Sequence, residues 1–194
     1  MHDIYKIILL GNANVGKTTF IELYINNYNY NSYIGTTIGI NMRSKIYPPI
    51  GEDNERKIII WDTAGQEKYR SLVSLHYRDC HGVILMFDLN DRKSYDDIRY
   101  WMKEIYKYNN KKIIFYIIGN KTDLERNVSY EEGKIMSDCY EATYFECSMY
   151  NLKIISKIFE QLIEEISTDT EIEPHQIPNK IPNNTATYYE NCSC

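Results

Sequence analysis

Residues 11–18 read G-N-A-N-V-G-K-T, a spacing of glycine, lysine and threonine that suits the binding of phosphate groups. This is the pattern G-x-x-x-x-G-K-[ST], in which glycines permit a tight turn whose backbone N–H groups face phosphate oxygens. Lys17 can supply a positive charge for the β- and γ-phosphates, and the Thr18 hydroxyl can ligate Mg²⁺. Because an apolar run over 4–10 precedes the pattern, the sequence predicts a strand, a phosphate-binding loop and a helix beginning near Lys17.

An acidic residue, Asp62, stands at the end of a second apolar run and opens the segment D-T-A-G-Q-E. In an open α/β sheet ligands bind at the carboxyl ends of the strands, and an acid there can hold Mg²⁺, often through water. A lone aspartate is also a common N-cap of a helix. That alternative does not explain why Gly65 and Gln66 follow, so a nucleotide site is the better interpretation.

A third polar group, Asn120, Lys121 and Asp123, follows the apolar run over 113–118. A carboxylate at Asp123 can accept two hydrogen bonds from the N1–H and N2–H₂ edge of guanine. Adenine offers no such edge, so a buried acid would stay unpaired and would reject it. Ser148, in the segment E-C-S after a further apolar run, completes a set that predicts a guanine-nucleotide site.

In their order and spacing these motifs resemble those of the Ras superfamily of small GTPases, and within it the Rab family. The resemblance extends over 4–167 and the final three residues, C-S-C. It implies an α/β fold of the P-loop small GTPase type, with a six-stranded, mostly parallel sheet, one antiparallel strand and helices on both faces. Rab-like segments lie at 38–42, 57–61, 68–72, 76–82 and 85–88.

The resemblance implies a role for each residue that matches a family motif. Gln66 would orient the attacking water, and Lys17 and Thr37 would complete the catalytic set. Thr18, Thr37 and Asp62 would hold Mg²⁺. The residues that the resemblance implies in binding GTP or GDP and its metal ion are Gly11, Asn14, Val15, Gly16, Lys17, Thr18, Thr19, Thr37, Asp62, Gly65, Asn120, Lys121, Asp123, Ser148 and Met149.

The function that the resemblance implies is a GTP-binding switch that hydrolyses GTP to GDP and regulates vesicle and membrane trafficking. Contacts of Thr37 and Gly65 with the γ-phosphate would hold two loops that its loss releases. The sequence shows no arginine finger in cis, so we expect slow intrinsic hydrolysis that an activating protein stimulates. The other expected partners of this monomer are an exchange factor, a GDI or escort protein, and effectors that bind the switch regions.

Two other function classes compete with this hypothesis. The first is a nucleotide-bound docking module with negligible hydrolysis, which engages or competes for the Rab machinery. Retention of Gln66, Thr37 and Lys17 favours an active GTPase over such a module. The second class, a soluble P-loop ATPase, is disfavoured by Asp123 and by the C-terminal cysteines.

The composition narrows the function classes further. A net charge of −5 argues against general nucleic-acid binding. The spacing of the five cysteines indicates neither a zinc cluster nor a disulfide framework, and it predicts a reducing compartment. We expect neither a signal peptide in 1–20 nor a transmembrane helix, because the apolar runs are short. Abundant Tyr, Ile, Asn and Lys indicate an AT-rich source genome, of a eukaryote or of a virus of one.

Hydrophobic periodicity predicts strands that alternate with helices, as in a mostly parallel sheet covered on both faces. Only a loop joins 38–47 to 57–62, which predicts an antiparallel hairpin. The expected strands are 4–10, 38–47, 57–62, 82–88, 112–118 and 143–147. The expected helices are 17–27, 67–78, 92–108, 131–140 and 150–167.

The chain is expected to divide into two parts. Residues 1–167 would form the GTPase domain, and 168–194, rich in proline and polar residues, would form a disordered tail. The end of this tail, with Cys192 and Cys194, is typical of doubly geranylgeranylated Rabs. Because one lipid chain anchors only marginally, we expect two, which would place the protein on the cytoplasmic face of intracellular membranes with a cytosolic pool.

Some positions in the nucleotide motifs depart from the family pattern. Ala13 and Asn14 replace a Ser/Gly-type pair, and asparagine tolerates a positive φ better than most residues. Met149 and Tyr150 stand where the family has alanine and lysine. Met149 still offers its N–H to guanine O6, whereas Tyr150 has to replace an aliphatic stem over the base.

Other departures concern the surfaces for partners. The aromatic triad that Rabs present to effectors maps to Met42, Trp61 and His76, so only the tryptophan is kept and different effectors are expected. For the aromatic contact to guanine from the first switch region there are two candidates, Tyr28 and Tyr30.

Overall fold

A single six-stranded sheet organises the part of the chain that the computed structural model describes, which comprises residues 4–26, 39–47, 56–63, 77–109 and 111–169. The strand order is β2-β3-β1-β4-β5-β6. The strands are β1 (Ile4–Leu10), β2 (Ile40–Tyr47), β3 (Arg56–Thr63), β4 (Gly82–Asp88), β5 (Ile114–Asn120) and β6 (Thr143–Cys147). Only β2 runs antiparallel to its neighbour, β3, which confirms both the mostly parallel sheet and the hairpin expected from the sequence.

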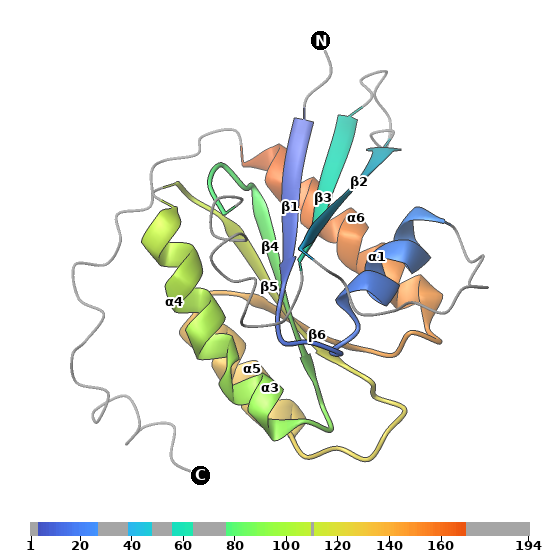
Figure 1. Ribbon diagram of the computed structural model, residues 1–194, viewed down its shortest axis with the longest axis vertical. Coiled ribbons are helices and arrows are strands. Elements are labelled where there is room, and N and C mark those ends of the chain that lie inside the picture. Colours follow the sequence, from blue (N-terminus) through green and yellow to red (C-terminus); the bar gives the residue numbers. More distant parts are fainter. Residues whose placement is uncertain (1–3, 27–38, 48–55, 64–76, 110, 170–194) are drawn as a thin grey trace.

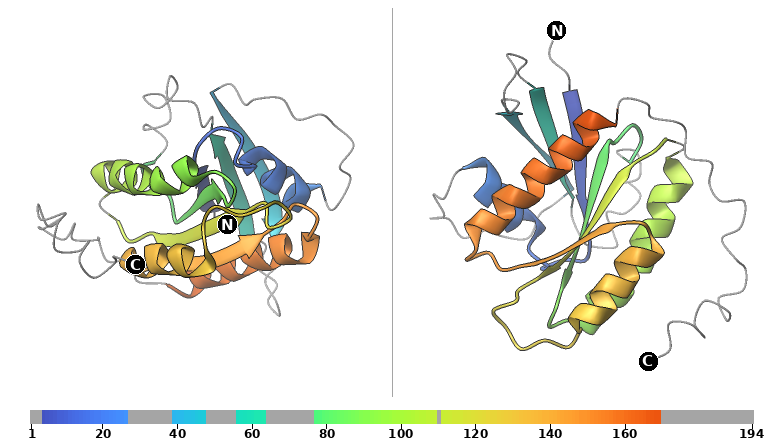
Figure 2. Two further views of the ribbon diagram at one scale, coloured as in Figure 1. Left: turned by 90° about the horizontal axis from the view of Figure 1, so that it is seen from below. Right: turned by 180° about the vertical axis from the view of Figure 1, so that it is seen from behind.

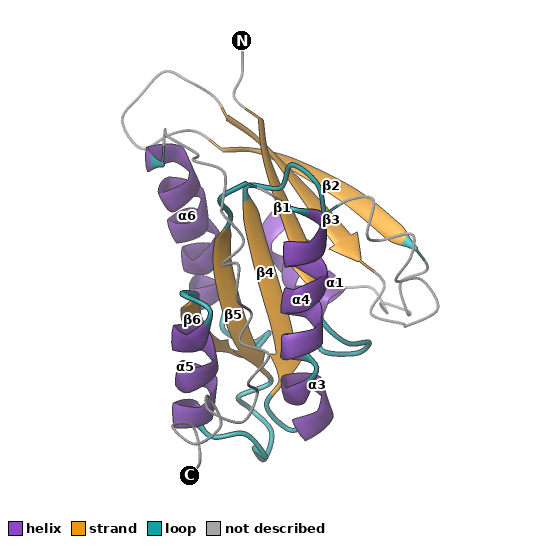
Figure 3. Ribbon diagram, turned by 90° about the vertical axis from the view of Figure 1, so that its left-hand side faces the viewer, coloured by secondary structure: helices purple, strands orange, loops and turns teal. Residues whose placement is uncertain are grey.

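Helices cover both faces of this sheet. Figure 3 shows α6 on one side of the strands and α4 on the other, and the right-hand view of Figure 2 shows α6 lying across the sheet with α1 beside it. The helices are α1 (Lys17–Ile25), α3 (Arg92–Asp96), α4 (Ile98–Tyr108), α5 (Tyr130–Cys139) and α6 (Leu152–Thr168). The helix expected at 67–78 lies outside the described residues except for its last two positions.

The expected single helix over 92–108 is wrong in one respect, because it is two helices that meet at Asp97. Asp97 has φ −71° and ψ −10°, and this ψ is far from the value near −42° of a regular α-helix. The hydrogen-bond ladder nevertheless continues across the junction. The Asp97 N–H donates to the carbonyl of Lys93, and the Trp101 N–H donates to the carbonyl of Asp97. The result is a change of helix geometry without a loop.

The core consists of two layers, one on each face of the sheet. Along β1, Ile7 and Leu9 belong to the layer beneath α1 and α6, whereas Ile8 and Leu10 belong to the layer beneath α4 and α5. All four side chains are completely buried, as is usual for a parallel strand covered on both faces. The spacing of apolar residues in α6 predicts a stripe that begins at Leu152, which is half-buried. The rest of the stripe is buried, namely Ile155, Ile158, Phe159, Leu162, Ile163 and Ile166.

The topology places the predicted motifs together at one end of the sheet, which is formed by the carboxyl ends of the parallel strands (Figure 1). The phosphate-binding loop follows β1, and Asp62 lies opposite Leu9 near the end of β3. Asn120 lies between Asp88 of β4 and Cys147 of β6 in the strand register. This end is therefore where the candidate site must be built. Among the described residues, no helix combines the length and the apolar character needed to cross a bilayer.

Candidate nucleotide-binding site

The phosphate-binding loop has the backbone conformation that its glycines predict. Gly11 has φ 137° and Gly16 has φ 102°, values that favour glycine. A Cβ at Gly11 would collide with the carbonyl oxygen of Met86, and a Cβ at Gly16 would collide with the amide nitrogen of Asn120. Asn14 also has a positive φ, 63°, as its residue type suggested. The loop is thus a close-packed turn that opens into the first turn of α1.

Lys17 is held within this loop. Its Nζ donates to the carbonyl oxygens of Gly11 at 2.9 Å and Asn12 at 2.7 Å, and the residue is only 5% exposed. Burial lowers the pKa of Lys17 to about 8, although the nearby charge of Asp62 favours the ammonium form. An ammonium group has three N–H donors. Among the described residues, two carbonyls use two of them, which leaves the third available for a phosphate oxygen.

Thr18 and Asp62, which the family motifs assign to Mg²⁺, are in direct contact beside the loop. The Thr18 hydroxyl donates to Asp62 Oδ2 at 2.8 Å. Asp62 is 2% exposed, and its Oδ1 is buried with no hydrogen-bond partner among the described residues. Burial raises the pKa of the Asp62 carboxyl, while the hydrogen bond from Thr18 and the charge of Lys17 lower it. Two oxygen donors together, one of them a buried carboxylate oxygen without a partner, fit Mg²⁺, which prefers oxygen ligands.

The segment 120–123, predicted to bind the base, is joined directly to the loop at 11–18. The side-chain amide of Asn120, which is completely buried, donates to the carbonyl oxygen of Val15 at 2.8 Å. The two residues are 105 positions apart in the sequence. This hydrogen bond fixes the distance between the part of the site that suits phosphates and the part that suits a base.

Asp123 is braced by Ser148. The Ser148 hydroxyl donates to Asp123 Oδ1 at 2.6 Å, and the N–H of Tyr150 donates to the Ser148 hydroxyl oxygen at 3.3 Å. The two loops are also joined by a backbone hydrogen bond from Thr122 to Cys147. One carboxylate oxygen of Asp123 is therefore fixed in place, and the residue is exposed, not buried, in this structure. The side chain of Tyr150 does not share in this bracing, because the residue is 86% exposed.

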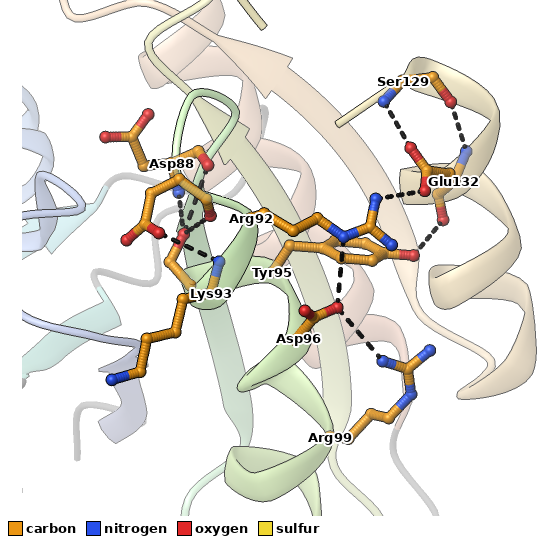
Figure 4. A network of polar contacts seen from close by, with 10 residues as sticks. Asp88, Arg92, Lys93, Tyr95, Asp96, Arg99, Ser129 and Glu132 are labelled. Atoms are coloured by element: carbon orange, nitrogen blue, oxygen red, sulfur yellow. Dashed lines mark hydrogen bonds and ion pairs between the residues drawn. The ribbon is translucent and has the colours of Figure 1, made fainter. Parts of the chain in front are cut away.

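Asp88 contacts the predicted site residue Lys121, although no nucleotide-binding role was expected for Asp88 itself. Its Oδ2 forms an ion pair with Nζ of Lys121 at a distance of 2.7 Å. Lys121 has a left-handed backbone conformation with φ 66°. Asp88 is anchored at the start of α3, where its N–H donates to the hydroxyl of Ser94 at 2.9 Å (Figure 4). The signal that could have found it is the one used for Asp62, an acid at the end of an apolar strand. Figure 4 also shows Arg92 reaching from α3 to Glu132 in the capping box of α5.

The structure brings together the predicted residues that it describes. Gly11, Asn14, Val15, Gly16, Lys17, Thr18 and Thr19 lie in or next to the phosphate-binding loop, and Asp62, Asn120, Lys121, Asp123, Ser148 and Met149 surround it from the ends of β3, β5 and β6. The remaining predicted positions lie outside the described residues: Thr37, Gly65, Gln66, Cys192 and Cys194, together with Tyr28, Tyr30 and His76. Of the expected effector positions, Met42 is 55% exposed and Trp61 is half-buried.

Comparison with known proteins agrees with this geometry. Residues 6–168 match the model of the Ras family. Ras-related protein RIC1 of Oryza sativa subsp. japonica is 34% identical over 80% of this chain and 77% of its own length. Ras-related protein RabC of Dictyostelium discoideum is 30% identical over 82% of each chain, and GTP-binding protein YPT1 of Saccharomyces cerevisiae is 34% identical over 75% of this chain and 70% of its own. The chain therefore belongs to the Ras family of small GTPases, and within it to the Rab family.

Proposed function

We propose that this chain is a magnesium-dependent GTPase that switches between GTP and GDP complexes and regulates membrane trafficking. The observation that carries the proposal is the joining of a phosphate-binding loop to a guanine-type base site by the hydrogen bond from Asn120 to Val15. Lys17 would bind the β- and γ-phosphates. Thr18 and Asp62 would hold Mg²⁺, which when bound neutralises charge that develops on the phosphates.

The hydrolytic step needs a water molecule in line with the γ-phosphate. We assign its orientation to the side-chain amide of Gln66 and the closure of the site to Thr37, on the basis of the family motifs. Neither Gln66 nor Thr37 supplies the positive charge that an arginine finger brings to the transition state of hydrolysis. Intrinsic turnover is therefore slow, and an activating protein supplies about 10³–10⁵ in rate by adding such a group.

Gln66→Leu tests this proposal. The variant keeps GTP affinity within about threefold but loses at least about tenfold in single-turnover hydrolysis, because leucine cannot orient the water. The measurement is hydrolysis of bound GTP with and without a Rab-type activating protein. Gln161→Leu, on α6 and away from the site, is the matched control and keeps the parent rate. A Gln66→Leu rate equal to that of the parent would instead support the docking module with negligible hydrolysis.

The expected partners are those of a Rab cycle: an exchange factor, an activating protein, a GDI or escort protein, and effectors. Attachment to the cytoplasmic face of a membrane would rest on Cys192 and Cys194. A single lipid chain gives only marginal binding, and the usual second signal is a cluster of basic residues. The segment 168–194 has one lysine, Lys180, against four acidic residues, so two lipids are needed.

Replacing either cysteine of this pair by serine should therefore leave the protein largely in the soluble fraction of a eukaryotic host. Intact-mass analysis of the parent from the same cells should show two geranylgeranyl groups. Cys139→Ser, which alters an exposed cysteine of α5, is the control and keeps the parent distribution. An unmodified mass in the membrane-bound pool would contradict lipid anchoring.

A further inference from the structure

The side chain of Asn12 connects the phosphate-binding loop to helix α4. Its amide nitrogen donates to Asp97 Oδ2 at 2.7 Å, and its amide oxygen accepts from the indole N–H of Trp101 at 3.1 Å. The chemistry of the two partners fixes this orientation, because an indole N–H only donates and a carboxylate only accepts. Asn12 thus uses both ends of its amide group to hold one loop against one helix.

The backbone of the same residue contacts the phosphate-binding lysine. The carbonyl oxygen of Asn12 accepts from Lys17 Nζ at 2.7 Å, which is shorter than the bond from Lys17 to Gly11. Asp97 and Trp101 therefore hold the side chain of Asn12, and the backbone carbonyl of Asn12 in turn holds Lys17. Any shift of the Asn12 peptide would move one of the two carbonyl groups that set where the ammonium group points.

The helix end of this connection is firmly placed. Trp101 is completely buried, and it lies in the core with Ile98, Met102 and Ile105. Asp97 is the first residue before α4, yet its carboxylate makes no capping hydrogen bond to that helix. An aspartate in this place ordinarily accepts from an N–H of the first turn. Here its carboxylate is directed at Asn12 instead.

We propose that Asp97 and Trp101 are positioning residues for Lys17, acting through Asn12, and that they set how tightly the site holds the phosphates. The inference rests on the proposed function of the site. It gives the junction between α3 and α4 a function. The helix geometry changes at Asp97, and the carboxylate of this same residue accepts a hydrogen bond from Asn12 of the loop. The proposal also explains why an asparagine, with one donor and one acceptor, stands second in the loop.

A charge-swap cycle tests the proposal. In Asn12→Asp two carboxylates face each other and the donor is lost, so GDP dissociation should quicken by at least about tenfold. Asp97→Asn keeps an acceptor for Asn12, and its effect should stay within about twofold. In the double variant Asn12→Asp/Asp97→Asn the donor and acceptor exchange places while Trp101 still donates. The dissociation rate should then return to within about threefold of the parent.

Dissociation is measured with fluorescent GDP on the full chain, alongside thermal unfolding of each complex. Asp96→Asn, which alters the neighbouring exposed acid, is the matched control and keeps the parent rate. The indole N–H resonance of Trp101, identified by its loss in Trp101→Phe, should shift in Asn12→Asp and return in the double variant. If the contact of Asn12 with Asp97 were purely structural, the faster GDP dissociation would follow the loss of thermal stability. The double variant would then recover neither the parent dissociation rate nor the parent Trp101 resonance.

Two results would overturn the inference: a double variant that releases GDP as fast as Asn12→Asp, or an Asn12→Asp variant that is less stable but releases GDP at the parent rate. Failure of the proposed function looks different. In that case the parent protein itself would bind neither GDP nor GTP. No GDP dissociation rate could then be measured for the parent or for the variants.

Discussion

Asp123→Asn should weaken the binding of GDP and GTP by about 10- to 150-fold and shift the preference towards xanthine nucleotides. A hydrogen bond to a charged group contributes about 1.5–3 kcal/mol, which corresponds to this range of affinity. Ser148 holds Oδ1 of Asp123, which fixes the orientation of the carboxylate that would accept from the base. An asparagine amide there would face the N–H groups of guanine with a donor, whereas the C2 carbonyl of xanthine accepts from it.

The measurement is a titration with fluorescent GDP and its xanthine counterpart. Asp91→Asn is a suitable control, because Asp91 caps α3 outside the site and asparagine caps a helix equally well. Unchanged GDP affinity in Asp123→Asn, or no gain for the xanthine nucleotide, would show that another group selects the base.

Thr18→Asn should lower GTP affinity far more than GDP affinity, by at least about tenfold in their ratio. The Thr18 hydroxyl and the Asp62 carboxylate lie 2.8 Å apart and together present oxygen ligands for Mg²⁺. A metal ion held by this pair would neutralise charge on the phosphates, so its loss should matter most when the γ-phosphate adds to that charge. Competition between GTP and GDP for fluorescent GDP, in excess Mg²⁺ and in a chelator, measures the ratio.

In the chelator the parent and Thr18→Asn should become alike, since neither then holds the metal ion. Thr168→Asn, at the end of α6, is the matched control and keeps the parent ratio, because its hydroxyl contacts only the helix carbonyls of Glu164 and Glu165 among the described residues. If Thr18→Asn changes GTP and GDP affinity equally in Mg²⁺, the pair does not act through the metal ion.

The parts of this site that the sequence predicted are those that depend on local backbone chemistry. Three such features can be recognised from neighbouring residues alone. They are a glycine at positive φ, a lysine at a helix start and an acid at the end of an apolar strand. Gly16, Lys17 and Asp62 show them, and the structure places all three as expected. The same holds for the strands, whose apolar runs mark the core layers directly.

The parts that the sequence did not predict are contacts between distant residues of ordinary type. Asn12 and Asp97 are 85 positions apart, and nothing near either of them indicates the other. Asp88 pairs with Lys121 only because β4 and β5 are neighbours in register. The junction at Asp97 interrupts no periodicity, since the helical hydrogen bonds continue through it. Such features follow from the assembled sheet and not from any one segment.

The most direct test of the central claim, a magnesium-dependent site for guanine nucleotides that hydrolyses GTP, is a single-turnover assay on the parent protein. The protein is loaded with GTP or with ATP and started with Mg²⁺ or with a chelator. We expect slow conversion of GTP to GDP only with Mg²⁺, marked acceleration by a Rab-type activating protein, and neither retention nor hydrolysis of ATP. Equal retention of ATP, or conversion of GTP at the same rate in the chelator, would contradict the account.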